Sequence, residues 1–422
     1  MPLIKRPKGT YDIIGEDAPF WHHFENKAKE SARVFGFEEI RTPILERTEL
    51  FKRSVGDETD IVQKEMYTFD DKGNRSMTLR PEGTAPVVRA FLENNLMSLG
   101  LPQKLFYMGP MFRYEKPQTG RYRQFHQFGV EIIGSSSSKA DVEIIWQAKY
   151  LIESLHLHNY KFQVNHLGCS SDRLEYKKAL KAYYKDHYDS LCDDCKVRYE
   201  NNILRLLDCK NPHDVALKEK APKLTEFLCD QCSAEYMTIK KQLGQLSIDY
   251  EENPFLVRGL DYYTGMVFEV KYPFSDTVLD ILGGGRYDHV ISELGGKDIP
   301  AVGYACGIER ILSIMKEEEV EINIKPLSEI FVLGMGEEAE PYVIKIVRFL
   351  RRKGISVEHD LMGRGLRTQM KYASKIGARF TIIIGDEEIN NGIYVVKDME
   401  TGNQTSVESS WIENYILDKL EE

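Results

Sequence analysis

Several features are scarce or missing in this 422-residue chain. No hydrophobic run approaches the length of a membrane span, and the opening residues, MPLIKRPKGTYD, lack the apolar core of a signal sequence. Seven cysteines are too few and too scattered for the disulfide framework of a secreted protein. Basic residues number 56 against 66 acidic ones, which argues against non-specific coating of nucleic acid. We therefore expect a cytoplasmic protein that does not contact membranes.

The phosphate loop G-x-x-x-x-G-K-[ST] is also missing. The composition is otherwise that of a globular protein, with 42% hydrophobic and 29% charged residues. A chain of this length is expected to form two or three domains, each with its own core.

Hydrophobic periodicity divides the chain into three parts. Helical spacing over residues 20–35 and 85–99 and strand-like patterns between Gln103 and Ile133 predict a mixed first domain. A Lys-, Tyr- and Asp-rich segment then predicts a mostly helical insertion, and after a charged linker (315–329) strands alternate with helices in a small α/β domain. The boundaries that we predict are residues 1–169 with 246–322, residues 170–245, and residues 328–422.

One predicted hairpin, at residues 107–134, carries an unusual set of side chains. Because alternate residues of a strand share a face, Arg113 and Glu115 point the same way, as do Phe125, Gln127 and Glu131 on the second strand. The opposite face is apolar and predicts contact with the core. Arginine matches phosphate oxygens, and an aromatic ring stacks on a purine, so the pattern indicates a nucleotide site. A solvated hairpin tip is the alternative interpretation.

Seven segments resemble a known family. Three are similar to the motifs of class II aminoacyl-tRNA synthetases: IRTPILE (40–46), FRYE (112–115) and GYACGIERIL (303–312). Four more resemble signature segments of the histidyl-tRNA synthetase family: RPKGTYD (6–12), LRPEGT (79–84), RGLDYYTG (258–265) and GGGRYD (283–288). The resemblance covers the whole chain, and the HIGH and KMSKS sequences of class I synthetases are missing.

The resemblance implies a fold and a reaction. The expected fold is α+β, with an antiparallel-sheet catalytic domain, a helical insertion and a C-terminal α/β anticodon-binding domain. The implied enzyme is a cytoplasmic homodimer that joins L-histidine to tRNA(His) through histidyl-adenylate, with ATP as substrate and Mg²⁺ on its phosphates. Ten Lys and Arg residues against two acidic ones between Lys345 and Arg379 fit a domain that binds RNA.

The resemblance also implies site residues. The catalytic residues would be Arg113 and Arg258 on the α-phosphate and Arg310 on the γ-phosphate. ATP would further contact Glu115, Arg121, Arg123 and Phe125. Histidine would be held by the two catalytic arginines of the α-phosphate and by Glu82, Gly83, Thr84, Gln127, Glu131, Tyr262, Tyr263, Gly284 and Gly285. Among these, Glu131 and Tyr263 would read the imidazole, and the two glycines of the GGGRYD segment would let the backbone approach the substrate.

Two other functions are to be weighed. A class II synthetase for proline, threonine or glycine would share motifs 2 and 3 but should lack RGLDYYTG. A regulatory, histidine-sensing subunit of the first enzyme of histidine synthesis would typically lack the C-terminal domain and the catalytic arginines, which are present here.

The insertion contains two C-x-x-C pairs, Cys192 with Cys195 and Cys229 with Cys232. Four thiolates could bind one structural Zn²⁺, although the 33 residues between the pairs exceed the usual gap of a zinc site. Plain thiols are the alternative, and this is also our expectation for Cys169 and Cys306.

Overall fold

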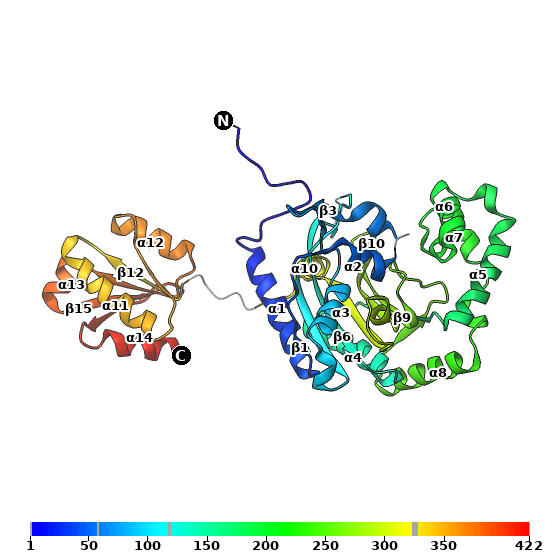
Figure 1. Ribbon diagram of the computed structural model, residues 1–422. Helices are drawn as coiled ribbons and strands as arrows, with labels where there is room; N and C mark the ends of the chain where they lie inside the picture. Colours follow the sequence, from blue (N-terminus) through cyan, green and yellow to red (C-terminus); the bar gives the residue numbers. More distant parts are fainter. Residues whose placement is uncertain (1, 57–58, 117–119, 323–327, 422) are drawn as a thin grey trace. The chain divides into compact units, whose positions relative to one another are not determined.

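The computed structural model describes residues 2–56, 59–116, 120–322 and 328–421 (Figure 1). It divides the chain into two compact units, Met1–Ile322 and Asn323–Glu422, which are described separately below. Part of the predicted linker (323–327) and the middle of the hairpin loop (117–119) lie outside the described residues. The fold class predicted from the sequence is confirmed: unit 1 is a mixed α+β unit and unit 2 an α/β unit.

Unit 1 is organised around a large sheet. Within the described residues, eight strands pair in the order β1-β5-β6-β11-β10-β9-β7-β8, all antiparallel except at the two edges, where β1 pairs with β5 and β7 with β8 in parallel. The strands are β1 (Glu38–Glu39), β5 (Gln103–Phe112), β6 (Gln124–Ile133), β7 (Lys161–His166), β8 (Tyr250–Glu252), β9 (Thr264–Phe274), β10 (Thr277–Arg286) and β11 (Ala301–Gly307).

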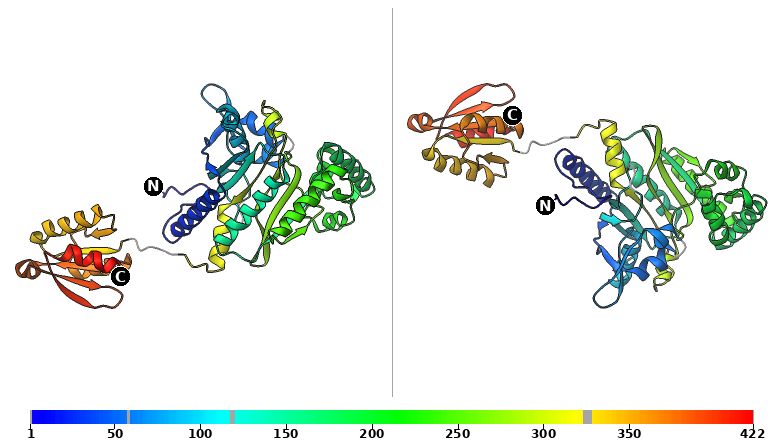
Figure 2. Two further views of the ribbon diagram at one scale, coloured as in Figure 1. Left: turned by 90° about the horizontal axis from the view of Figure 1, so that it is seen from below. Right: turned by 90° about the horizontal axis from the view of Figure 1, so that it is seen from above.

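Helices cover one face of this sheet. They are α1 (Asp17–Val34), α4 (Ser138–Ser154), α10 (Ile308–Glu317) and α8 (Asp230–Gln245). Figure 2 shows α1 in blue, α4 in cyan and α10 in yellow side by side, and α1 contacts both of the others. The predicted stripe of Phe128, Val130 and Ile132 on β6 packs into the core beneath them. The cavity described below therefore lies on the other face.

A smaller layer frames the opposite face. It consists of the antiparallel sheet β2-β4-β3 and short helices around it. Their bounds are β2 (Leu45–Arg47), β3 (Tyr67–Asp70), β4 (Ser76–Leu79), α2 (Thr48–Val55), α3 (Thr84–Glu93), α9 (Val290–Glu293), the π-helix η1 (Ile61–Glu65) and the 3-10 turn η2 (Leu96–Leu99). The helix predicted over 85–99 is shorter than expected, because Asn95 adopts a left-handed conformation with φ +50° after α3.

The insertion is helical, as the sequence predicts, but its helices are short between the two long ones. It leaves the sheet after β7 and returns through α8 before β8. Its elements are α5 (Ser170–Lys185), η3 (Tyr188–Ser190), α6 (Asp193–Asn201), η4 (Ile203–Asp208), α7 (Pro212–Lys218) and η5 (Leu224–Glu226). The turn η4 contacts α5, α6 and α7, so it forms the centre of this lobe.

Unit 2 has a five-stranded sheet in the order β13-β12-β14-β15-β16 within the described residues. Its elements are β12 (Ile330–Gly334), η6 (Glu337–Ala339), α11 (Glu340–Arg352), β13 (Val357–His359), α12 (Leu366–Lys375), β14 (Phe380–Ile384), α13 (Asp386–Asn391), β15 (Ile393–Asp398), β16 (Gln404–Glu408) and α14 (Ile412–Glu421). Strand β16 was not predicted, since its alternating polar residues resemble a loop. In the part of the chain that the structure describes, no helix is long and apolar enough to cross a membrane.

Candidate active site

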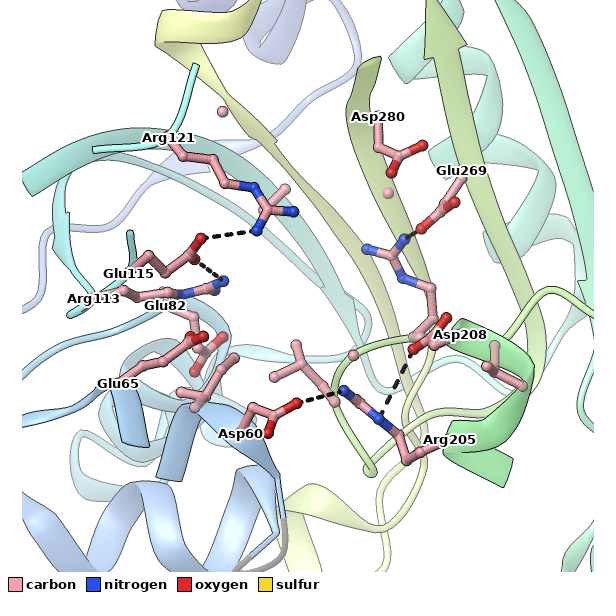
Figure 3. A pocket seen from close by; sticks show the side chains of 18 of the residues that line it. Asp60, Glu65, Glu82, Arg113, Glu115, Arg121, Arg205, Asp208, Glu269 and Asp280 are labelled. Carbon is pink, nitrogen blue, oxygen red and sulfur yellow. Dashed lines mark hydrogen bonds and ion pairs between the residues drawn. The ribbon is translucent and has the colours of Figure 1, made fainter. Parts of the chain in front are cut away.

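A cavity of about 960 Å³ opens on the uncovered face of the large sheet in unit 1. Strands β6, β9, β10 and β11, helix α10 and the turn η4 of the insertion all contribute residues to its walls. Figure 3 shows two groups of charged side chains facing each other, with Arg113, Glu115 and Arg121 on one wall and Glu269, Asp280 and Asp208 on the other. The cavity therefore brings together residues that are up to 250 positions apart in the sequence, Asp60 and Arg310.

The first wall is the end of the hairpin discussed above. Arg113 follows β5 directly, donates through Nε to the carbonyl oxygen of Pro81 at 2.8 Å, and lies 5.3 Å from the centre of the Phe125 ring. Glu115 accepts from Nη1 of Arg121 at 3.1 Å. Phe125 and Gln127 line the cavity from β6, as strand parity predicts.

The second wall is formed by the segment before β9. Arg258 forms an ion pair with Glu269 of β9 and lies 5.8 Å from the centre of the Tyr263 ring. Burial opposes the charge of Arg258, but Glu269, Tyr263, Tyr262 and Asp208 together outweigh it and raise the pKa of the guanidinium. Its Nε is buried and finds no hydrogen-bond partner among the described residues. A Cβ at Gly283 would lie 2.4 Å from Nη1 of Arg258, so this glycine makes room for the guanidinium.

Arg310, in the first turn of α10, reaches the same cavity. Its Nε donates to the carbonyl oxygen of Gly120 at 3.3 Å, and its Nη1 donates to that of Asp280. Burial lowers the pKa of the Arg310 guanidinium, and the neighbouring Arg121 lowers it further. Two arginines that repel each other in a partly buried cavity favour an anionic ligand.

The inner end of the cavity is built from Glu82, Thr84 and Gln127. Glu82 accepts hydrogen bonds from the backbone N–H groups of Thr84 and Ala85 at 2.7 and 2.8 Å, which caps the start of α3. Burial raises the pKa of its carboxyl group. The Oε1 atom of Gln127 is buried without a hydrogen-bond partner among the described residues. This end therefore offers acceptors to a donor-rich group.

Glu131 lies behind this end and does not line the cavity. Its Oε1 accepts from the Thr84 hydroxyl at 2.7 Å and its Oε2 from the Tyr287 hydroxyl at 2.6 Å. Burial raises the pKa of Glu131 to about 8, against the opposite influence of those two hydrogen bonds. Tyr262 and Tyr263 line the adjoining wall with their ring centres 4.6 Å apart.

Besides Glu131, four predicted site residues are not among those that line the cavity: Arg123, Gly83, Gly284 and Gly285. The guanidinium of Arg123 stacks on the Tyr114 ring at 3.9 Å, and its backbone N–H donates to the carbonyl oxygen of Gly9. Gly9 has a φ of +84°, and an added Cβ would lie 2.7 Å from Cγ of Arg123, which accounts for the glycine of RPKGTYD. Protein packing accounts for glycine at 83, 284 and 285. An added Cβ at Gly83 would lie 2.1 Å from the Tyr107 ring, at Gly284 2.1 Å from the Gly303 carbonyl oxygen, and at Gly285 2.5 Å from that of Met266.

Other residues support the site although no sequence motif predicted that role for them. Glu309 of α10 accepts hydrogen bonds from the backbone N–H of His126 and from the Tyr11 hydroxyl, so it joins motif 3 to the hairpin and to the N-terminal segment. Arg205 of the insertion lies 3.4 Å from Asp60 across the cavity mouth (Figure 3). One supporting residue belongs to the GGGRYD segment. Its Arg286 forms a buried ion pair with Asp141 of α4.

The predicted zinc site of four cysteines is wrong in its grouping. Among the described residues, each C-x-x-C pair joins a different cluster of possible metal ligands, with atoms within 4.8 Å of one another. We name these clusters A (Cys192, Cys195, Cys209, Asp214) and B (Cys169, Asp172, Cys229, Cys232). Cys169, expected to be a plain buried thiol, is only partly buried and belongs to cluster B, whereas Cys306 is buried in β11.

Comparison with known proteins places these observations in a family. Residues 9–311 match the model of histidyl-tRNA synthetase, and residues 329–419 match that of an anticodon binding domain. A histidine–tRNA ligase of Thermosipho melanesiensis is 53% identical over 97% of both chains, and one of Thermotoga petrophila is 52% identical over 99% of both. The crystal structure of apo S. aureus histidyl-tRNA synthetase superposes with a TM-score of 0.84 at 38% identity, covering 98% of this chain and 99% of that one.

These matches cover nearly the whole length of this chain and of each relative. They agree with the signature segments that line or support the cavity. The chain therefore belongs to the histidyl-tRNA synthetase family, and its activity is that of a histidine–tRNA ligase.

Proposed function

We propose that the cavity of unit 1 binds ATP and L-histidine together and forms histidyl-adenylate, which then esterifies tRNA(His). The observation that carries this proposal is the convergence of three arginines, Arg113, Arg258 and Arg310, on one cavity of sufficient volume for both substrates. The carboxylate of histidine is already a nucleophile. The main barrier is therefore the approach of two anions, which positioned guanidinium groups lower.

ATP would lie along the hairpin wall. Arg113 would bind the α-phosphate, and the adenine would stack against Phe125, whose ring already lies beside that guanidinium. Arg121 and Arg310 would bind the outer phosphates, since their mutual repulsion is relieved by an anion between them. Glu115 orients Arg121 and would move with it when ATP enters.

Arg258 would bind the α-phosphate from the opposite wall. Glu269 and Tyr263 hold its guanidinium in place, and its buried Nε is a donor that lacks a partner among the described residues. In the transition state, negative charge grows on the bridging oxygen as pyrophosphate leaves. Two arginines fixed on either side of the phosphorus stabilise this charge with little reorganisation.

Mg²⁺ fits the same cavity. Carboxylate oxygens of Glu115 and Asp280 line it and are the ligands that this ion prefers, and we propose that they hold it beside the phosphates. When bound, the ion would neutralise charge on the pyrophosphate leaving group.

Histidine would occupy the inner end. Glu82, Gln127 and the backbone near Thr84 surround the position proposed for its ammonium group. An imidazole N–H would compete with the Thr84 hydroxyl for Oε1 of Glu131, and Tyr263 would contact the ring from the side. A ligand without a ring nitrogen would leave these buried groups unpaired, which is the basis of the expected selectivity.

Unit 2 would bind the anticodon of tRNA(His). Three arginines of the basic segment, Arg348, Arg351 and Arg352, line a groove of about 450 Å³ on α11 together with His359. Guanidinium planes next to apolar side chains suit splayed, single-stranded bases and their phosphates.

We also propose that the enzyme is a cytoplasmic homodimer. Ile44, Leu45 and Phe69, in or next to the motif 1 region, are more than 40% exposed in the single chain, which favours an interface there. Sedimentation of the purified chain at micromolar concentration would show a dimer, and a monomer would contradict this part of the proposal.

The decisive experiment is ATP–pyrophosphate exchange with each amino acid in turn. We expect exchange with histidine only, lost by at least 100-fold in Arg258→Ala and retained in Arg33→Ala, which removes an exposed arginine of α1. Exchange with another amino acid would overturn the proposed substrate. Histidine binding without any exchange would favour the regulatory-subunit alternative.

A further inference from the structure

The insertion brings six of the seven cysteines and two aspartates of this chain into clusters A and B. In both clusters a C-x-x-C pair starts a helix: Cys192 precedes α6 and Cys229 precedes α8. Each pair is completed by one more cysteine and one aspartate from another segment. The same donor set therefore occurs twice, assembled from different parts of the chain.

The spacing of the donor atoms in cluster A matches a single tetrahedral ion. The Sγ atoms of Cys192 and Cys209 are 3.8 Å apart, and Cys209 Sγ is 3.4 Å from Oδ2 of Asp214. Ligands at about 2.3 Å for sulfur and about 2.0 Å for oxygen around tetrahedral zinc give separations of about 3.8 and 3.5 Å. The backbone N–H of Asn211 also donates to Cys209 Sγ at 3.4 Å, which stabilises negative charge on sulfur.

Cluster B joins the two ends of the insertion. Cys169 precedes α5, where the chain leaves β7, and Cys229 precedes the returning helix α8. Asp172 accepts from the backbone N–H of Cys169 and from that of Cys229, both at 3.1 Å, so its carboxylate is held between the two helix starts. Cys232 is buried beside it.

The two aspartates are buried, 4% and 2% exposed, and no Lys or Arg forms an ion pair with either among the described residues. Asp172 accepts the two backbone N–H groups named above, and Asp214 accepts from the backbone N–H of Cys192 at 3.3 Å and lies 3.3 Å from Nδ1 of His213. These contacts fix each carboxylate beside the thiols of its cluster. A divalent ion shared by the carboxylate and the thiolates would offset part of their negative charge.

Other occupants fit less well. A disulfide would use two cysteines of each cluster and leave the third thiol and the carboxylate unexplained. An iron–sulfur cluster binds its thiolates through different iron atoms, which requires wider separations than the 4.8 Å limit found here. Three thiolates and one carboxylate at single-ion spacing are a zinc donor set.

We propose that each cluster binds one structural zinc ion, so that the chain carries two. Between the long helices α5 and α8, the lobe consists of helices of nine residues or fewer and 3-10 turns. A metal cross-link would add to the apolar contacts that hold these short elements in one arrangement. Cluster A also fixes a wall of the cavity, since Cys192 and Cys209 line it and η4 carries Arg205 and Asp208.

The test is the zinc content of the full-length chain, purified under reducing conditions without chelator and measured by mass spectrometry of the metals. We expect two zinc ions per chain. Cys195→Ser in cluster A and Cys232→Ser in cluster B should each leave one, and Cys306→Ser, which removes a buried thiol outside both clusters, should leave two. This readout does not depend on activity, so it separates failure of this proposal from failure of the proposed reaction.

Cobalt gives a second measurement that does not require a variant to fold. The metal-free wild-type chain should bind two equivalents of Co²⁺ with the sulfur-to-cobalt charge-transfer absorption of thiolate ligands. A chain without zinc whose thiols are all free, or whose cysteines form disulfides by mass spectrometry, would overturn the proposal. If the wild-type chain holds only one zinc ion and that ion survives one of the two substitutions, the proposal is overturned for the cluster substituted in that variant.

Discussion

The two large sheets of this chain differ in whether ionisable side chains are buried against them. In unit 2 both faces of the sheet pack against apolar side chains, from α11 and α14 on one side and α12 on the other. In unit 1 one face is equally apolar, but the other holds two buried carboxyl groups, of Glu82 and Glu131, and the partly buried guanidinium of Arg258. The ionisable side chains of unit 2 therefore lie outside its core, whereas unit 1 buries several of them against its sheet, which lowers its stability.

The difference indicates where each unit binds its ligand. A buried carboxyl with a raised pKa and a guanidinium with a lowered one are unfavourable in the free protein. Substrates of opposite charge relieve this cost on binding, so the cavity of unit 1 is organised before they arrive. The groove of unit 2 needs no such organisation, because exposed arginines remain solvated until RNA reaches them.

The largest effect that we expect is loss of catalysis without loss of fold. Arg113→Ala should reduce the rate of histidine-dependent ATP–pyrophosphate exchange by about 100- to 1000-fold, since it removes a phosphate ligand. The melting temperature should change by less than about 2 °C, because among the described residues the side chain makes one hydrogen bond, to Pro81, and a 3.9 Å ion pair with Glu115. A large fall in melting temperature would show that Arg113 is mainly structural and would weaken the contrast between the units.

In unit 2 we expect the reverse result, loss of stability without loss of pyrophosphate exchange. Ile382 of β14 is fully buried in the apolar core, so Ile382→Ala should destabilise unit 2 by about 2–5 kcal/mol. Exchange should continue at the wild-type rate, because every residue of the cavity belongs to unit 1, while charging of tRNA(His) should fall. Loss of exchange would mean that the catalytic unit depends on unit 2 for its stability.

In unit 1, strand parity predicted correctly which face of the sheet some residues of β6 occupy. Phe125 and Gln127 were placed correctly on the cavity side of β6, and Phe128 on the core side. Arg123, which the family resemblance assigns to ATP, precedes β6, so strand parity makes no prediction for it; it stacks on Tyr114 and is not among the residues that line the cavity. Strand parity is local, so it predicts faces but not the packing of loops.

Contacts between distant segments could not be predicted in the same way. The close approach of β10 to its neighbours explains Gly284 and Gly285, and only the sheet register reveals it. The grouping of the cysteines failed for the same reason, since each C-x-x-C pair finds its third cysteine and its aspartate through the fold of the insertion. Residue types indicated a metal site, but sequence distance alone did not indicate its members.

A smaller effect is expected from the pH dependence of stability. The pKa of Glu131 is about 8 in the folded chain, above its ordinary value of 4.5, so its contribution to stability is complete below pH 4.5 and is lost as the pH rises through 8. Between pH 5 and 8 the free energy of unfolding of unit 1 should fall by about 1.4 kcal/mol per pH unit from this group. Glu131→Gln should remove that slope.

Tryptophan fluorescence in urea can measure this slope for unit 1 alone. Trp21 and Trp146 lie in unit 1, whereas Trp411 lies in unit 2 and is half exposed, so both proteins should carry Trp411→Phe. Equal slopes with and without Glu131 would show that its carboxyl is ionised in the folded chain and that the two hydroxyl donors outweigh burial.

The smallest effect that we expect is in the groove of unit 2. Arg348→Ala should weaken tRNA binding only a few-fold and lower the dependence of log Kd on log salt concentration by about one, as expected when one phosphate contact is lost. Lys397→Ala, on β15 outside the groove, is the matched control for removing a positive charge from this unit. If both variants weaken binding equally, the groove contributes only general charge. If Arg348→Ala alone weakens binding, the surface groove of unit 2 is a defined RNA site. The two units then differ in where they bind: unit 1 binds its ligands in a cavity with buried ionisable residues, and unit 2 binds RNA on its surface.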